Sequence, residues 1–211
     1  CDELISDGAG YRLGRVREKF LRSMLIGIEH ADSLNLTSIA GALDEGIRLH
    51  ATQKRLSRNL DDQVLVDFLQ NRLLSLATSD VSDDSWLVVH TYSLEKRYAK
   101  KIEYLGPTGR ELDHGFKVCE VLAIKPEKRV YKPLVTHVWS NKIPDFESDS
   151  SEVAKTLDRV LDATGNKGLV FFDDQSVGAE LVESLINRRA FDYFSMMRSD
   201  DAKVVHRDEE W

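Results

Sequence analysis

Apolar residues in the first third of the chain recur every three or four positions, the spacing of amphipathic helices. The first such run consists of Val16, Phe20, Met24, Leu25 and Ile28. Three more segments with this spacing follow, and a hydroxyl of Thr37 or Ser38 is expected to cap the second helix. The pattern predicts helices over residues 11–77. The polar, turn-forming stretch 78–84 then marks a boundary.

After that boundary the apolar positions alternate with polar ones or form short continuous runs, as in β-strands. Two of the predicted strands form a hairpin across residues 125–128. A helix capped by Ser150 or Ser151 and ended by Gly165 precedes the fourth strand, and a second helix precedes the fifth. The five predicted strands cover 85–92, 115–124, 129–139, 169–172 and 191–197. We therefore predict an α/β fold: a mixed sheet with flanking helices, preceded by a small helical N-terminal domain.

The order of these elements is that of a ribonuclease-H-like sheet, in which three strands, a crossover helix and a fourth strand follow one another. Since parallel crossovers are right-handed, strand 169–172 is expected to lie beside strand 86–90. Each strand leads into a polar residue, His90 in the first and Asp173 after the second. The topology therefore predicts that His90 and Asp173 face one crevice.

Composition is that of a globular protein. The chain has 211 residues, 42% of them hydrophobic, which is enough for one core and a smaller appendage. No apolar run approaches the ~18 residues of a membrane span, so we expect no membrane association. The two cysteines belong to no metal-ligand cluster, which favours a reducing cytoplasm over a disulfide framework or structural zinc. The chain starts at Cys1 without a secretory leader, and we expect a fragment or a processed product.

Charge is distributed unevenly along the chain. The net charge is −7, yet residues 11–60 hold nine bases and five acids, while residues 143–211 hold sixteen acids and eight bases. An acidic average does not exclude nucleic acid binding when the bases are segregated. The charge of the helical N-terminal part therefore permits nucleic acid binding but does not by itself indicate it.

The aspartate after the fourth strand suits phosphodiester chemistry. Two magnesium ions that clamp the attacking and leaving oxygens need clustered carboxylates, because hard cations prefer oxygen ligands. Asp173 fits one of these positions. The alternative is that Asp173 and Asp174 form only a polar turn between a strand and a helix.

Several segments resemble one family, the bacterial DDE transposases of cut-and-paste insertion sequences. The most specific is the run Lys96–Leu105 (KRYAKKIEYL) after the first strand, which is similar to the family's first catalytic block. Further similarities span almost the whole chain from about Phe20 to Arg198. They are Gly115-Phe116, Pro133-Leu134, Trp139-Ser140, the segment 171–175 (FFDDQ) and the basic segment 54–58 (KRLSR).

The resemblance implies a function and its requirements. Residues 1–80 would be a helical DNA-binding region and residues 85–211 an incomplete ribonuclease-H-like catalytic core. The expected activity is DNA transposition: cleavage and strand transfer at terminal inverted repeats of double-stranded DNA, with Mg²⁺ or Mn²⁺ as the cofactor. The resemblance assigns Asp173 to the metal and to catalysis, and marks His90 as the other catalytic position. The expected location is the cytoplasm, at the bacterial nucleoid.

The chain departs from the family pattern at the catalytic positions. His90 stands where the family has its first metal-binding aspartate, and an imidazole suits softer ions than Mg²⁺. Asp174-Gln175 replaces the usual Arg-Gly, and no residue is assigned to the third acid, including Glu209 and Glu210 at the end of the chain. We therefore expect weakened metal binding and an enzyme with little or no strand-transfer activity.

Basic residues in two places are candidates for contacting DNA, as the resemblance implies. The alternative for the helical segment 54–58 is a solvated helix face. The candidates are Lys54, Arg55, Arg58, Lys96, Lys100 and Lys101. Two other functions stay open: a non-catalytic remnant that binds DNA or dimerises and competes with intact transposase, and a different ribonuclease-H-like nuclease.

Overall fold

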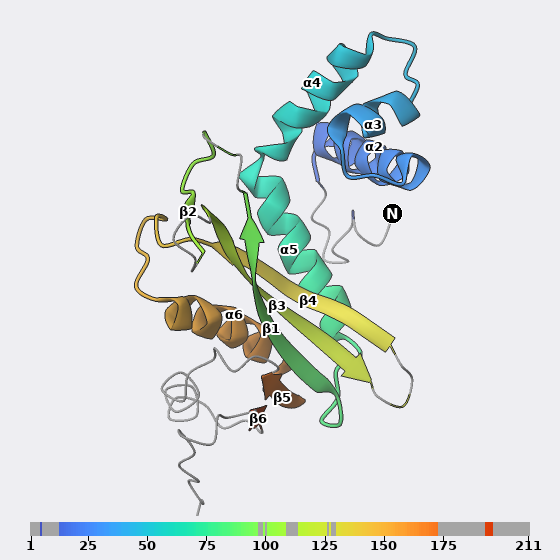
Figure 1. Ribbon diagram of the computed structural model, residues 1–211. Coiled ribbons are helices and arrows are strands. Elements are labelled where there is room, and N and C mark those ends of the chain that lie inside the picture. Colours follow the sequence, from blue (N-terminus) through green and yellow to red (C-terminus); the bar gives the residue numbers. More distant parts are fainter. Residues whose placement is uncertain are drawn as a thin grey trace, which may run out of the picture. The chain divides into compact units, whose positions relative to one another are not determined.

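The computed structural model describes Ile5 and residues 13–96, 99, 101–108, 114–125, 127, 130–172 and 193–195. The chain forms two compact units, Cys1–Leu73 and Leu74–Trp211. In Figure 1 the first unit consists of helices, and the second contains the sheet and a helix packed against it. Helices and strands thus occur together, which confirms the predicted α/β class.

Helices dominate the described part of the first unit. They are α2 (Arg15–Ala31), α3 (Leu36–Ala42), α4 (Leu49–Leu60) and the start of α5 (Gln63–Thr78), which continues into the second unit. Apolar side chains from these helices and the preceding segment form one core. Its buried members are Ile5, Leu13, Phe20, Leu21, Ile39, Ala40, Leu56 and Leu65.

The cap of α3 differs from the sequence prediction. Asn35, rather than Thr37 or Ser38, is the N-cap, and its Oδ1 accepts hydrogen bonds from the backbone N–H groups of Thr37 (2.9 Å) and Ser38 (3.3 Å). Asparagine is among the best N-cap residues because its short side chain reaches these N–H groups. The helix therefore begins earlier than its apolar pattern indicates.

The second unit is built on one mixed sheet with six strands among the described residues. Their order is β2-β3-β1-β5-β6, and β4 also pairs with β3. Strands β1, β3 and β4 are antiparallel neighbours, whereas β5 and β6 run parallel to β1. The strands are β1 (Trp86–Glu95), β2 (Gly106–Pro107), β3 (His114–Lys125), β4 (Val130–Trp139), β5 (Leu169–Phe172) and β6 (Tyr193–Ser195).

Two predicted pairings are confirmed. Strands β3 and β4 form the expected hairpin, with Lys125 opposite Val130. Strand β5 lies parallel to β1, from Trp86↔Leu169 to Val89↔Phe172. Strand β1 therefore occupies the middle of the sheet, between an antiparallel and a parallel neighbour.

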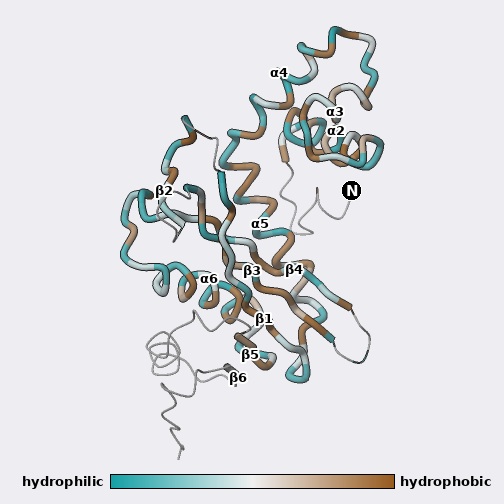
Figure 2. The backbone as a smooth tube through the Cα atoms, in the orientation of Figure 1, coloured by the Kyte–Doolittle hydropathy of each residue, from teal (hydrophilic) through white to brown (hydrophobic). Residues whose placement is uncertain are grey.

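Helix α6 (Asp149–Thr164) covers one face of the sheet. Its apolar residues, including Leu157 and Leu161, pack with buried strand residues such as Leu87, Val89 and Phe172. Figure 2 shows hydrophobic residues concentrated in the strands, whereas the loop between α5 and β1 is hydrophilic. The core of the second unit therefore lies between this face of the sheet and α6.

The ends of α6 were predicted with mixed success. Gly165 ends the helix in the left-handed region (φ 65°), as predicted. The N-cap is Ser148, not Ser150 or Ser151, and its Oγ accepts a hydrogen bond from the N–H of Ser151 at 3.0 Å. The three serines lie within four positions, and the apolar pattern alone cannot choose among them because the first helical turn is polar.

Within the part of the chain that the structure describes, no helix combines the length and apolar character needed to cross a membrane.

Candidate functional site

His90 lies inside β1 rather than at its end. Pairing with β3 continues along β1 as far as Glu95↔Gly115, while the described pairing with β5 stops at Val89↔Phe172. The predicted strand 85–92 is too short, because pairing with β3 carries β1 on to Glu95, and the expectation that the strand presents His90 from its end is wrong. Asp173, the other predicted catalytic and metal-binding residue, lies outside the described residues.

The imidazole of His90 belongs to the face of the sheet that α6 does not cover. Successive residues of a strand point to opposite faces. Leu87 and Val89 are fully buried against α6, whereas Trp86 (43% exposed) and Tyr92 (40%) are not. His90 shares their side of β1 and is partly exposed. A ligand can therefore approach it from this face.

A glutamate lies next to His90 across the sheet. His90 and Glu120 are register partners in β1 and β3, and side chains opposite each other in an antiparallel pair are close neighbours. The hydroxyl of Tyr92 donates a hydrogen bond of 3.0 Å to Oε1 of Glu120, and this bond raises the pKa of Tyr92. The rings of His90 and Tyr92 stack with centroids 5.5 Å apart. Together the three side chains form a polar cluster on an otherwise largely apolar face.

Glu120 is not among the site residues predicted from the sequence. The signal was available, since Glu120 interrupts the apolar alternation of Phe116, Val118, Leu122 and Ile124 in the predicted second strand. A charged residue at such a position marks either a sheet edge or a polar site. Only the pairing of β1 with β3 shows that this carboxylate faces His90.

The described part of this cluster does not make a magnesium site. It offers one carboxylate and one imidazole, a donor set that suits a transition-metal ion better than Mg²⁺. No group of three or more histidine, cysteine, aspartate or glutamate side chains among the described residues is arranged to hold a metal ion. A carboxylate-rich two-metal site would need acids beyond Glu120.

The described residues 101–108 after β1 belong to a loop that is fastened to the sheet. Lys96 and Lys101 are exposed, and Lys100 is outside the described residues. The hydroxyl of Ser140, which is buried, donates a hydrogen bond to the carbonyl of Tyr104. A Cβ atom on Gly106 would lie only 2.6 Å from Oδ1 of Asn141. The loop therefore has a fixed anchor immediately after β4.

Two other residues of the family-like motifs have structural roles. A Cβ atom on Gly115 would lie 2.1 Å from the carbonyl oxygen of Leu94, so only glycine fits where β3 meets the end of β1. Trp139 is almost fully buried, and its Nε1 donates a hydrogen bond of 2.9 Å to Asp149. These motif residues thus hold the sheet and its loops together.

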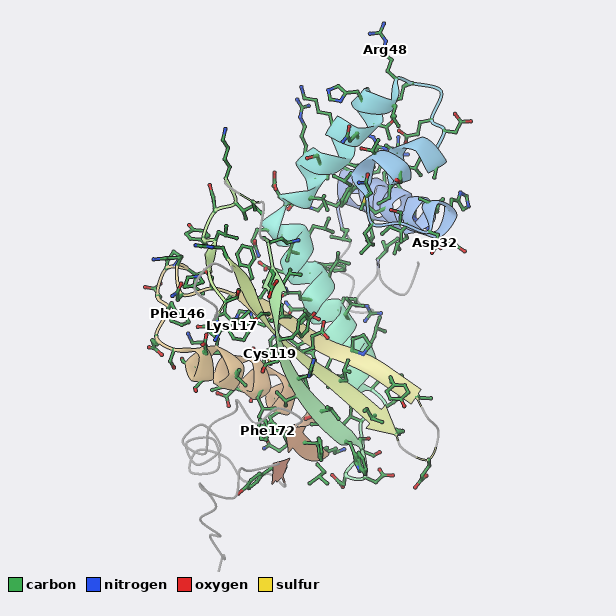
Figure 3. The ribbon with its side chains drawn as sticks, viewed as in Figure 1. Asp32, Arg48, Lys117, Cys119, Phe146 and Phe172 are labelled. Carbon is green, nitrogen blue, oxygen red and sulfur yellow. The ribbon has the colours of Figure 1, made fainter. Side chains whose placement is uncertain are left out.

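The face of the sheet under α6 carries a polar network around Glu152. This glutamate is 4% exposed and contacts Nε2 of His137 at 2.7 Å and Nζ of Lys155 at 2.8 Å. Burial would raise the pKa of Glu152, but the hydrogen bonds from Lys155 and His137 lower it below its usual value. Lys117, labelled in Figure 3, makes an ion pair with Asp149 at the start of α6. This network joins α6 to β3 and β4.

The three basic candidates of α4 separate into two groups. Lys54 and Arg58 are exposed and four residues apart, so they share one helix face. Arg55 lies on another side, where its guanidinium contacts Glu45 at 2.6 Å. Lys54 and Arg58 are therefore the α4 bases best placed to meet a phosphate backbone.

Comparison of the sequence with models of known protein families and with curated proteins found no match to either.

Proposed function

We propose that this chain is derived from a DDE transposase of the insertion-sequence type and binds DNA with little or no strand-transfer activity. In this proposal the second unit is a ribonuclease-H-like core and the first unit is its DNA-binding region. The strand order β4-β3-β1-β5-β6, with β5 and β6 parallel to β1, supports the proposal because it is the order that such a core has.

The observation that carries the proposal is the register between β1 and β5. Val89 pairs with Phe172, and the next residues in the sequence are His90 and Asp173. In the proposed core these two residues occupy the positions of the first two metal-binding acids. Mg²⁺ or Mn²⁺ bound there would polarise a phosphodiester and activate the attacking oxygen.

Impaired catalysis follows from the side chain at position 90. An imidazole in place of a carboxylate removes one negative charge from a site meant for two dications, and it prefers softer ions. Glu120 lies opposite His90, but its carboxylate is engaged by the hydroxyl of Tyr92. The chain would then act as a remnant that occupies DNA, alone or as a dimer, and competes with an intact transposase.

Restoring the acid tests the metal site. We expect His90→Asp to raise the affinity for Mn²⁺, followed by electron paramagnetic resonance of the free ion, by at least about tenfold, equivalent to ~1.4 kcal/mol. The gain should disappear in His90→Asp/Asp173→Ala. Ser93→Asp adds the same charge at an exposed position of β1 and serves as the matched control.

Two results would contradict the metal-site proposal. One is a gain that survives Asp173→Ala, and the other is an equal gain in Ser93→Asp. Nicking assays of supercoiled plasmid that carries the DNA flanking the gene test the activity. Robust nicking by the wild-type chain that is lost in Asp173→Ala would show that the site is intact rather than impaired. Cleavage of RNA–DNA hybrid without preference for these ends would instead indicate a general ribonuclease-H-like nuclease.

Salt dependence tests the DNA-binding part separately. Each phosphate neutralised by a base adds about 0.9 to the slope of log affinity against log salt concentration. We expect Lys54→Gln/Arg58→Gln to reduce that slope by about 2 in gel-shift titrations. Lys167→Gln removes an exposed base just before β5 and should leave the slope unchanged. An equal effect of Lys167→Gln would mean that the binding is not localised to α4.

A further inference from the structure

The first unit carries a groove that the proposed DNA contacts do not use. It has a volume of about 660 Å³ and lies between α2 and α4, with Leu43 after α3 completing the lining. Lys54 and Arg58 are not among the lining residues, whereas Arg55 is. We call it the α2–α4 groove.

One face of α2 forms most of this groove. The lining residues from Arg15 to Ile26 span eleven steps of the helix, or roughly 17 Å, which is about three turns. Val16 is 72% exposed and Ile26 is 45% exposed, and the buried Phe20 also lines the groove. The apolar lining residues of α2, which are Val16, Phe20 and Ile26, lie along this length with Lys19 and Ser23 among them. This apolar stripe offers the kind of contact that an amphipathic helix makes with a groove.

Basic side chains lie within and beside the apolar stripe. Arg15, Lys19, Arg22 and Arg55 line the groove together with a single carboxylate, that of Glu18. Arg22 contacts Glu18 at 3.3 Å, and Arg55 contacts Glu45 beside the groove at 2.6 Å. Among the lining residues, four basic side chains thus face one carboxylate. A ligand with negative charge on its flanks would complement this border.

These features together select the chemistry of the ligand. A DNA backbone presents phosphates without apolar surface, so it would leave Val16 and Ile26 in water. An acidic amphipathic helix satisfies both parts, because its apolar residues cover the stripe and its carboxylates meet the bases. We propose that the α2–α4 groove binds an acidic amphipathic helix of a partner protein. This inference does not depend on the transposase proposal.

A designed peptide probes the groove directly. The probe is a fluorescein-labelled helix of about 16 residues, roughly 24 Å long, with leucines at i, i+3, i+4 and i+7 and glutamates on both flanks. A second peptide has the same composition with its leucines distributed around the helix. Fluorescence anisotropy with the full chain measures both affinities. We expect the patterned peptide to bind at least about tenfold more tightly than the permuted one.

Variants assign the binding to the groove. Val16→Asp and Lys19→Glu change exposed side chains, so circular dichroism should stay that of the wild type while peptide affinity falls about tenfold or more. Lys167→Glu, an exposed base outside the first unit, is the matched control and should leave peptide binding unchanged. The proposal is overturned if neither peptide binds, if both bind equally, or if Lys167→Glu weakens the peptide as much as Lys19→Glu. A competition experiment with duplex DNA gives one more result that would overturn the proposal. If the DNA displaces the patterned peptide and binds more weakly to Lys19→Glu, the groove binds the phosphates of DNA instead.

Discussion

Replacing Gly27 by alanine tests how closely α2 and α3 pack. Gly27 is buried in α2, and a Cβ atom there would lie 2.6 Å from Cγ2 of Ile39 and 3.3 Å from the carbonyl oxygen of the same residue. Ile39 is fully buried, so its side chain cannot turn toward solvent. A methyl group at position 27 therefore requires the two helices to move apart.

Two opposing effects determine the result. Alanine favours a helix interior over glycine by about 1 kcal/mol. Overpacking costs about 1–3 kcal/mol, and a contact at 2.6 Å, far inside the ordinary carbon–carbon separation of about 3.5–4.0 Å, belongs in the upper part of that range. We expect Gly27→Ala to lower the free energy of unfolding by about 1–2 kcal/mol.

Gly41→Ala is the matched control in α3. A Cβ atom at Gly41 would meet only Cδ1 of Leu49 at 3.8 Å, an ordinary contact. The helix-propensity gain then remains without the packing cost, and we expect Gly41→Ala to be up to about 1 kcal/mol more stable than the wild type. The two glycine-to-alanine changes should thus have opposite signs.

Urea unfolding of the full chain measures both effects. Far-ultraviolet circular dichroism follows the helices, whereas the three tryptophans, Trp86, Trp139 and Trp211, all come after Leu73 and report on the second unit. With a urea m-value of about 1–3 kcal/mol/M, the dichroism midpoints of the two variants should differ by about 1 M. A midpoint for Gly27→Ala as high as that for Gly41→Ala would refute the close packing of α2 on α3.

Three further predictions concern stability. The lowered pKa of Glu152 means that its ionised form stabilises the fold above pH 4.5, and this contribution disappears as pH falls through the folded-state pKa. Glu152→Gln should therefore lower the urea midpoint at neutral pH and make the midpoint less dependent on pH in the acidic range. Leu157→Ala, which empties a fully buried position in α6, should cost about 2–5 kcal/mol in unfolding followed by tryptophan fluorescence. Asn35→Ala should cost about 1 kcal/mol by circular dichroism, and Asn35→Asp should retain most of the stability because aspartate also caps helices.

Local patterns predicted most of the described elements, because the spacing of apolar residues and the choice of turn residues depend on short stretches of sequence. The hairpin of β3 and β4 and the glycine end of α6 are examples. Boundaries that depend on another strand were less accessible. The extension of β1 beyond its predicted end at residue 92 results from its pairing with β3, which residues 93–95 alone do not reveal.

The candidate site was predicted less completely than the fold. The pairing that brings the end of β5 beside β1 followed from element order and the handedness of crossovers. Glu120 was missed, since only the cross-strand register shows that it faces His90. The different surroundings of Arg55 and Arg58 were also hidden, because the ion pair with Glu45 joins residues ten positions apart through the turn before α4.

The central place of β1 has a consequence for biosynthesis. Its antiparallel neighbour β3 follows closely in the chain, but Leu169, the partner of Trp86 in β5, comes 83 residues later. During translation the apolar β1 can join β3 and β4 while its other edge still lacks a neighbour. Such an open edge can pair with another nascent chain, so prompt folding of α6 and delivery of β5 protect the newly made protein from aggregation.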